Sequence, residues 1–130
     1  MLIEVEKLTR FGGGPLLAQV QTPIGRTAVC WHGLPDAQPG PYHVEWTIDE
    51  PICWGRNARL AEVQAPWIGP GAHGVILRGR LECDGAGATL DLGGSVVLLE
   101  LLDPVPDNVA GGWVDLFTER EKIGLYPFDL

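Results

Sequence analysis

Acid–base chemistry is the first possibility that the residue pattern raises, because carboxylates and a histidine share one face of a predicted strand. His43, Glu45 and Asp49 alternate with apolar residues over positions 43–49. A general acid–base pair works when burial moves two pKa values apart. Because this face is the polar side of a half-buried strand, we expect its charges to be solvated. The pattern predicts no catalytic residue here, although a catalytic or small-molecule-binding β-barrel using His43 and Glu45 stays as an alternative.

Nucleophilic and metal-ligating residues are sparse in this chain. Ser95 is the only serine, and its neighbours lack the later glycine that a nucleophile elbow needs. Cys30 and His32 stand two apart on one strand face, which is a chelating arrangement with too few ligands for a zinc site. No CxxC or HExxH spacing occurs. These residues predict no metal and no cofactor, and they favour a protein that is not an enzyme.

A glycine-rich segment, Gly69-Pro-Gly71-Ala-His-Gly74, matches the dinucleotide-binding spacing GxGxxG. That motif needs a helix N-terminus after it, so that backbone amides meet the pyrophosphate. The residues that follow, from Val75 to Leu81, alternate in the manner of a strand. We therefore interpret the segment as a loop that connects β-strands.

Two tryptophans in long Pro/Gly loops are the best candidates for binding residues. Trp67 and Ile68 lie in a segment braced by prolines, and Trp54 lies in the preceding loop. Prolines reduce the entropy that a loop loses on binding, and exposed aromatic residues anchor interfaces. The sequence predicts that Trp54, Trp67 and Ile68 bind a partner. The alternative is that they fold back and cap the core, as we expect for Trp31 and Trp113 at strand ends.

The charge balance narrows the class of partner. The chain carries 17 acidic and 9 basic residues, a formal net charge of −8. This balance opposes binding to a nucleic-acid backbone or to an anionic membrane, which both need a positive surface. It favours a partner with a basic surface, or it serves solubility. Arg78 and Arg80 share one strand face, so an OB-like binder of single-stranded nucleic acid stays as an alternative.

Length and cysteine usage indicate one domain in a reducing compartment. A chain of 130 residues is most simply a single domain, 1–130, with a core of its own. The three cysteines are odd in number, and Cys83 falls on the apolar face of a predicted strand. The most apolar run, Val96–Leu102, is too short to span a bilayer. We therefore expect a cytoplasmic protein without membrane contact.

Short strands must position all of these residues, because the dominant apolar period is two. The Asp84–Gly87 step predicts a β-hairpin. Positions 58–64 suit a strand or a brief helix, and positions 65–74 read as a loop. The predicted strands are Leu2–Leu8, Leu16–Gln21, Arg26–Trp31, His43–Asp49, Val75–Cys83, Ala88–Leu92, Ser95–Leu101, Gly112–Phe117 and Ile123–Phe128.

The predicted fold is a single all-β domain, a small antiparallel barrel or sandwich with at most one or two short helices. The strand order at the end of the chain is loosely similar to that of five-stranded Greek-key, OB-like barrels. The predicted function is a non-enzymatic acidic module that binds a protein partner. A concrete form is an inhibitor or immunity-type protein that blocks a basic toxin or enzyme. The chain is expected to be a monomer or a homodimer paired through edge strands.

Overall fold

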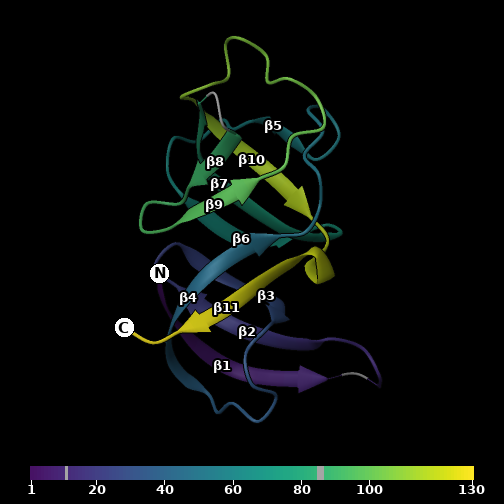
Figure 1. Cartoon of the computed structure of the whole chain (residues 1–130), viewed down its shortest axis with the longest axis vertical. Helices are drawn as coiled ribbons and strands as arrows, with labels where there is room; N and C mark the ends of the chain where they lie inside the picture. Colours follow the sequence, from purple (N-terminus) through teal and green to yellow (C-terminus); the bar gives the residue numbers. More distant parts are fainter. Residues whose placement is uncertain (11, 85–86) are drawn as a thin grey trace.

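The computed structural model describes residues 1–10, 12–84 and 87–130, and over these residues the protein is all-β. Its strands form two lobes along the long axis, a closed barrel and a second sheet (Figure 1). The helical element described is a single 3-10 turn, η1 (Arg120–Lys122). Within the described ranges, no helix is long and apolar enough to cross a membrane. The predicted all-β fold class is confirmed.

The barrel closes through five strands in the order β1-β2-β3-β11-β4. Neighbouring strands are antiparallel, except that β3 and β11 pair in parallel with Gly124 opposite Cys30. The final strand therefore lies between the third and fourth strands, and this return closes the barrel. The bounds are β1 Leu2–Arg10, β2 Leu16–Thr22, β3 Gly25–Trp31, β4 Gly40–Ile48 and β11 Ile123–Phe128.

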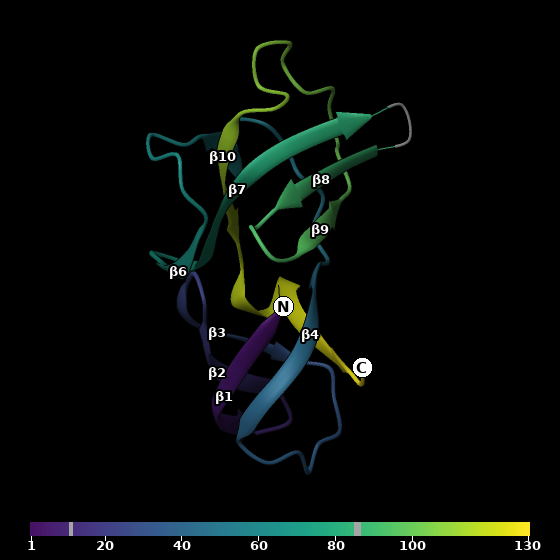
Figure 2. The same cartoon turned by 90° about the vertical axis from the view of Figure 1, so that its left-hand side faces the viewer.

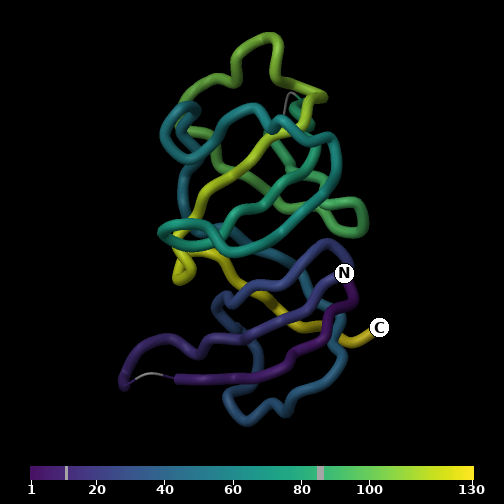
Figure 3. The backbone as a smooth tube through the Cα atoms, turned by 180° about the vertical axis from the view of Figure 1, so that it is seen from behind, coloured from purple at the N-terminus to yellow at the C-terminus, as the bar shows by residue number. Residues whose placement is uncertain are grey.

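The second sheet is inserted in the sequence between β4 and β11. Its order is β5-β10-β7-β8-β9, and β6 also pairs with β7. The chain leaves the barrel after β4 and returns through η1, so two segments join the lobes (Figures 2 and 3). The bounds are β5 Ala58–Leu60, β6 Trp67–Gly71, β7 Gly74–Asp84, β8 Gly87–Asp91, β9 Val96–Leu99 and β10 Trp113–Thr118.

One continuous core holds the two lobes together. Buried apolar side chains of the barrel, such as Val29 and Trp46, belong to the same cluster as Leu77 and Leu90 of the sheet. At the junction, the turn between β2 and β3 lies against β6, where the Ile68 N–H donates to the Ile24 carbonyl oxygen over 3.1 Å. The lobes are therefore packed and hydrogen-bonded to each other.

Two predictions about local structure are wrong. Positions 65–74 do not form a loop throughout, because β6 occupies Trp67–Gly71 and pairs with β7 as a hairpin. Pro70 suits this position, since β6 pairs with one strand only and its missing N–H costs no ladder bond there. Cys83 is exposed rather than in the core, because β7 runs past its last buried residue, Leu81.

The hairpin between β7 and β8 is confirmed by the pairing of Asp84 with Gly87. The predicted turn residues Gly85 and Ala86 lie outside the described residues. Positions 58–64, which suited strand or helix, form the short strand β5 over their first three residues. The other predicted strands are present, with ends that differ by up to three residues from the expected bounds.

Candidate functional site

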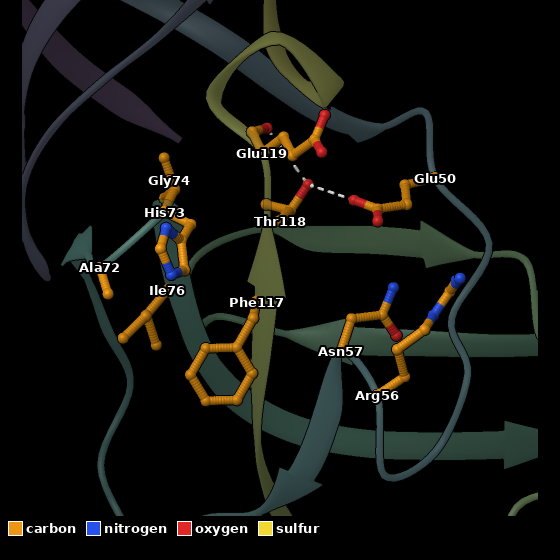
Figure 4. A pocket seen from close by; sticks show the side chains of 12 residues that line it. Glu50, Arg56, Asn57, Ala72, His73, Gly74, Ile76, Phe117, Thr118 and Glu119 are labelled. Atoms are coloured by element: carbon orange, nitrogen blue, oxygen red, sulfur yellow. Dashed lines mark hydrogen bonds between the residues drawn. The ribbon is translucent and has the colours of Figure 1, made fainter.

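The candidate site is a cavity of about 510 Å³ on the second sheet, next to the return to the barrel. Three segments line it: the loop after β4, the turn between β6 and β7, and the end of β10 with the start of η1 (Figure 4). This volume lies within the range typical of ligand pockets. The two long loops in which the sequence placed its tryptophan candidates supply two of the three walls.

The loop after β4 is held in place by Asn57, which is buried. The Asn57 side-chain oxygen accepts from the Cys53 N–H over 2.8 Å, and its amide group donates to the Pro51 carbonyl over 3.0 Å. The Asn57 carbonyl accepts in turn from the Phe117 N–H over 2.8 Å, which ties the loop to β10. Because these bonds fix the backbone, Glu50 and Arg56 are presented to the cavity from a defined loop.

The opposite wall is the two-residue turn of the β6–β7 hairpin, Ala72 and His73. Both residues are exposed and line the cavity. Gly74 follows them, and a Cβ at this position would overlap with the Thr118 carbonyl oxygen of β10. A glycine is therefore required where the hairpin passes closest to the end of β10.

The apolar part of the cavity comes from Phe117 and Ile76, which lie directly opposite each other on β10 and β7. The Arg59 guanidinium lies over the Phe117 ring, 4.7 Å from its centroid. This arrangement is a cation–π contact from the neighbouring strand β5. Arg59 thus covers one face of the Phe117 ring, and Phe117 contributes apolar surface to the cavity.

A row of three charged side chains and Trp67 crosses four strands next to Phe117. Arg78 donates to Asp115 over 2.8 Å, Arg59 lies 4.0 Å from the same carboxylate, and Arg78 lies over the Trp67 ring. Cross-strand pairing places these four residues opposite one another on β5, β10, β7 and β6. Asp115 is 6% exposed and Arg78 is 19% exposed, so this ion pair is largely desolvated. The row fixes the sheet beneath the cavity.

The rim of the cavity is polar and carries charges of both signs. Glu50 accepts a hydrogen bond from the Thr118 hydroxyl over 3.1 Å through one of its two carboxylate oxygens (Figure 4). Glu119 follows Thr118 directly and is exposed. Arg56 lies on the same loop as Glu50, and His73 lies on the opposite wall (Figure 4). The site therefore combines an aromatic surface with two carboxylates on one side, which suits a cation with an apolar stem.

The predicted binding residues lie beside this cavity but do not line it. Ile68 is 0% exposed and packs between the lobes, as in the alternative that it folds back onto the core. Trp67 is half-buried beneath Arg78. Trp54 is half-buried and packs against the core. That Trp54 and Trp67 contact a partner stays a prediction, and the structure brings neither into the cavity.

The other residues singled out in the sequence have separate surroundings. His43 lies near Phe128, with 6.1 Å between the ring centroids, while Glu45 lines a different cavity. His32 stacks on Tyr126, and the Cys30 thiol donates to the Glu121 carbonyl. Over the residues that the structure describes, no group of three His, Cys, Asp or Glu side chains is placed to hold a metal ion.

Arg78 and Arg80, which suggested a positive strip, both have internal partners. Arg78 pairs with Asp115, and Arg80 donates to the Gly111 carbonyl over 3.0 Å.

Burial raises the pKa of the Cys30 thiol above its usual range, and the negative charge of Glu121 raises it further. A buried thiol with a raised pKa is a weak nucleophile.

Sequence reasoning missed the residues that line the cavity. Glu50, Arg56 and His73 lie in the two Pro/Gly-rich loops that the sequence indicated as candidate binding loops. The predicted binding residues of these loops included the tryptophans and none of these three residues. Phe117 and Glu119 carried no signal, because they meet these loops only in the folded protein. The pairing of β10 with β7 brings them to the β6–β7 turn, about 45 residues away, and the bond from the Phe117 N–H to Asn57 brings them to the loop after β4, about 60 to 70 residues away. Comparison of the chain with family models, with curated proteins and with solved structures gives no match.

Proposed function

We propose that the protein is a non-enzymatic acidic binding module that engages a protein partner through this cavity. The observation that carries the proposal is the placement of Glu50 and Glu119 beside the Phe117 surface. A basic side chain of the partner, above all an arginine, fits these groups. Its aliphatic stem lies on Phe117 and Ile76, and its guanidinium meets the carboxylates.

Long-range electrostatics support a basic partner. The net charge of −8 attracts a positive surface and speeds association at low ionic strength. Arg56, which shares a loop with Glu50, limits how many positive charges the cavity itself can neutralise, so a single basic side chain is the expected occupant. An inhibitor or immunity-type protein that blocks a basic toxin or enzyme is a concrete form of this function.

A second candidate function is the binding of a small molecule in the same cavity. Its volume of about 510 Å³ favours this candidate, because small-ligand sites occupy a similar range. The ligand would again carry a cationic group beside an apolar or aromatic part. The two candidate functions predict different affinities. A small-molecule site binds its free ligand tightly, whereas an isolated side chain of a protein partner binds weakly, because most of the binding energy then comes from contacts around the pocket.

The compartment is proposed as cytoplasmic on the basis of the cysteines. Cys30, Cys53 and Cys83 are all free, and they differ in burial from buried to exposed. Free thiols of this kind persist in a reducing compartment.

The proposal is tested by titrating the 15N-labelled protein with Nα-acetyl-L-arginine methylamide and following amide chemical shifts. We expect the largest changes at Glu50, His73, Phe117 and Glu119, with a dissociation constant in the millimolar range that weakens with salt. Matched titrations with the norleucine and aspartate methylamides control for apolar and for anionic binding. Equal shifts for all three compounds, or shifts elsewhere, would contradict the proposal.

A further inference from the structure

A second surface lies on the other side of the junction from the cavity of Figure 4. In Figure 1, β9 and the end of β11 are on the left, whereas η1 is on the right. Two further cavities, of about 460 and 540 Å³, are both lined by Phe128. Phe128 therefore forms a ridge between them. This surface includes residues of both lobes, since Val96 and Leu98 belong to the second sheet.

The side chains around this ridge are apolar and unusually exposed. Leu98 is 77% exposed, Val96 is 55% exposed and Phe128 is 41% exposed. Leu34, at the edge of the second cavity, is exposed to a similar degree. Isolated exposed apolar side chains are common, but a group that lines two adjoining hollows is typical of an interaction surface.

The interior of each hollow is also apolar, and aromatic residues support it. Trp46 lines the first hollow, and Trp31 and Tyr42 line the second, where their rings meet edge to face at 5.0 Å. The Trp31 indole donates to the Leu34 carbonyl, and the Tyr42 hydroxyl donates to the Gln38 carbonyl. Because their polar atoms are satisfied within the protein, these rings offer apolar contact to an occupant.

The charged side chains around the ridge are acidic, while the Met1 ammonium in the first hollow donates to the Val44 carbonyl over 3.1 Å. Glu45 lines the first hollow and Asp129 lines the second, and neither described lining includes a lysine or an arginine. A basic segment complements this charge and gains from the net charge of −8. A second copy of this chain carries the same net charge and is repelled by it.

We propose that this surface, the Phe128 ridge with its two hollows, docks an extended segment of a partner protein. The segment carries a large apolar side chain for each hollow and lysine or arginine residues next to them. The ridge separates the two side chains, and Glu45 and Asp129 receive the basic groups. This proposal does not depend on the cavity of Figure 4 or on the function proposed for it.

The experiment uses the full chain, biotinylated and immobilised, and a phage library that displays random peptides of about twelve residues. We expect enrichment of peptides with two large apolar residues and at least one lysine or arginine. The affinity of the enriched peptides is then measured for wild type, Leu98→Lys, Phe128→Ala and the control Leu60→Lys. Leu60 is also exposed and apolar but lies on β5, at the opposite edge of the second sheet.

We expect both ridge variants to weaken binding at least about tenfold, while Leu60→Lys binds as wild type does. Amide shifts on peptide binding should centre on Val96, Leu98 and Phe128. Three results would overturn the proposal. The first is no enrichment, or enrichment of acidic peptides. The second is a peptide that binds Leu98→Lys as well as wild type, or whose shifts centre on the Figure 4 cavity.

The third contrary result is the formation of a dimer of this chain through the same surface. If sedimentation shows a wild-type dimer that Leu98→Lys dissociates, the surface is an interface between copies of this chain, and the proposed basic segment is wrong. Because Leu98 is 77% exposed, the lysine has room without disturbing the core. If the arginine derivative does not bind the cavity of Figure 4, the proposal for the Phe128 ridge is unaffected. The two proposals therefore fail separately.

Discussion

Asp115 lies at the centre of the paired residues that cross the sheet next to the candidate cavity. Its carboxylate is nearly buried and faces two arginines, of which Arg78 is itself mostly covered. A buried ion pair contributes little net stability while both partners are present, but the loss of one partner leaves a desolvated charge. The same carboxylate keeps Arg59 near Phe117. Asp115 thus acts on the cavity through the arginines.

Replacing Asp115 with asparagine should destabilise the protein by about 2 to 3 kcal/mol, because Arg78 loses its counter-charge in a covered position. The measurement is the free energy of unfolding in urea. The matched control is Glu6→Gln, which removes an exposed partner of Arg26 at 3.8 Å and should cost less than about 0.5 kcal/mol. Equal effects of the two substitutions would show that burial does not strengthen the Asp115 pair.

The cysteines should differ in reactivity because their surroundings differ. Cys83 is exposed, whereas burial and then Glu121 raise the pKa of the Cys30 thiol. Since the thiolate is the reactive form, N-ethylmaleimide at about pH 8 should label Cys83 first and Cys30 last. Peptide mass spectrometry measures the order. Labelling of Cys30 at the rate of Cys83 would contradict the burial argument.

The raised pKa of Cys30 also has a consequence for stability. The folded thiol stays protonated at a pH where the thiol of the unfolded chain already ionises. Its contribution to stability is therefore complete below the ordinary thiol pKa and is lost as the pH rises through the higher folded value. Cys30→Ala should flatten this alkaline loss in urea titrations.

At the scale of elements, β6 shows what the sequence could and could not predict. Alternation identified most strands, because one face of each meets the core and the other meets water. In β6 the sequence Trp-Ile-Gly-Pro-Gly lacks that alternation, and its pairing comes from β7 and from the turn before β3. Tertiary contacts thus outweighed the low strand propensity of glycine and proline. For the same reason, the sequence could not decide whether Ile68 is exposed or folds back onto the core.

Gly25 is the position where the contact between the lobes can be tested. Its φ is +145°, and a Cβ there would overlap with the Ile68 carbonyl oxygen of β6. Gly40 has the same φ, yet a Cβ would meet nothing within 4 Å. Both alanine substitutions share the backbone strain, so their difference isolates the contact.

Gly25→Ala should lower the free energy of unfolding by about 2 kcal/mol more than Gly40→Ala, because it pushes β6 away from the barrel. Urea unfolding of the two variants beside wild type provides the measurement. Equal losses would mean that the turn before β3 does not hold β6.

At the scale of the whole molecule, the chain combines a five-stranded barrel with a sheet inserted between its last two strands. The sequence predicted a small barrel or sandwich, and local patterns could not reveal the strand order. Order depends on pairings such as β1 with β4 and β3 with β11, which join residues far apart in the sequence. The cavity could not be predicted for the same reason. The three segments that line it are far apart in the sequence and meet only in the folded protein.

The two lobes should unfold together, because one continuous core spans both of them and the chain crosses between them twice. Native-state hydrogen exchange in low urea measures this. Slowly exchanging amides of β3 and of β7 should converge on one opening free energy. A lower value for the whole of the second sheet would show that it opens as an independent unit.

If the cavity of Figure 4 binds a basic side chain, a bulky residue placed in its wall should block that binding. The dissociation constant of Nα-acetyl-L-arginine methylamide is compared for wild type, Ala72→Trp and Ala65→Trp. Ala72 is exposed and lines the cavity, whereas Ala65 is an exposed alanine outside its lining. The predicted result is that Ala72→Trp weakens binding at least about tenfold while Ala65→Trp binds as wild type does. Unchanged binding by Ala72→Trp, or no binding by wild type, would contradict the claim.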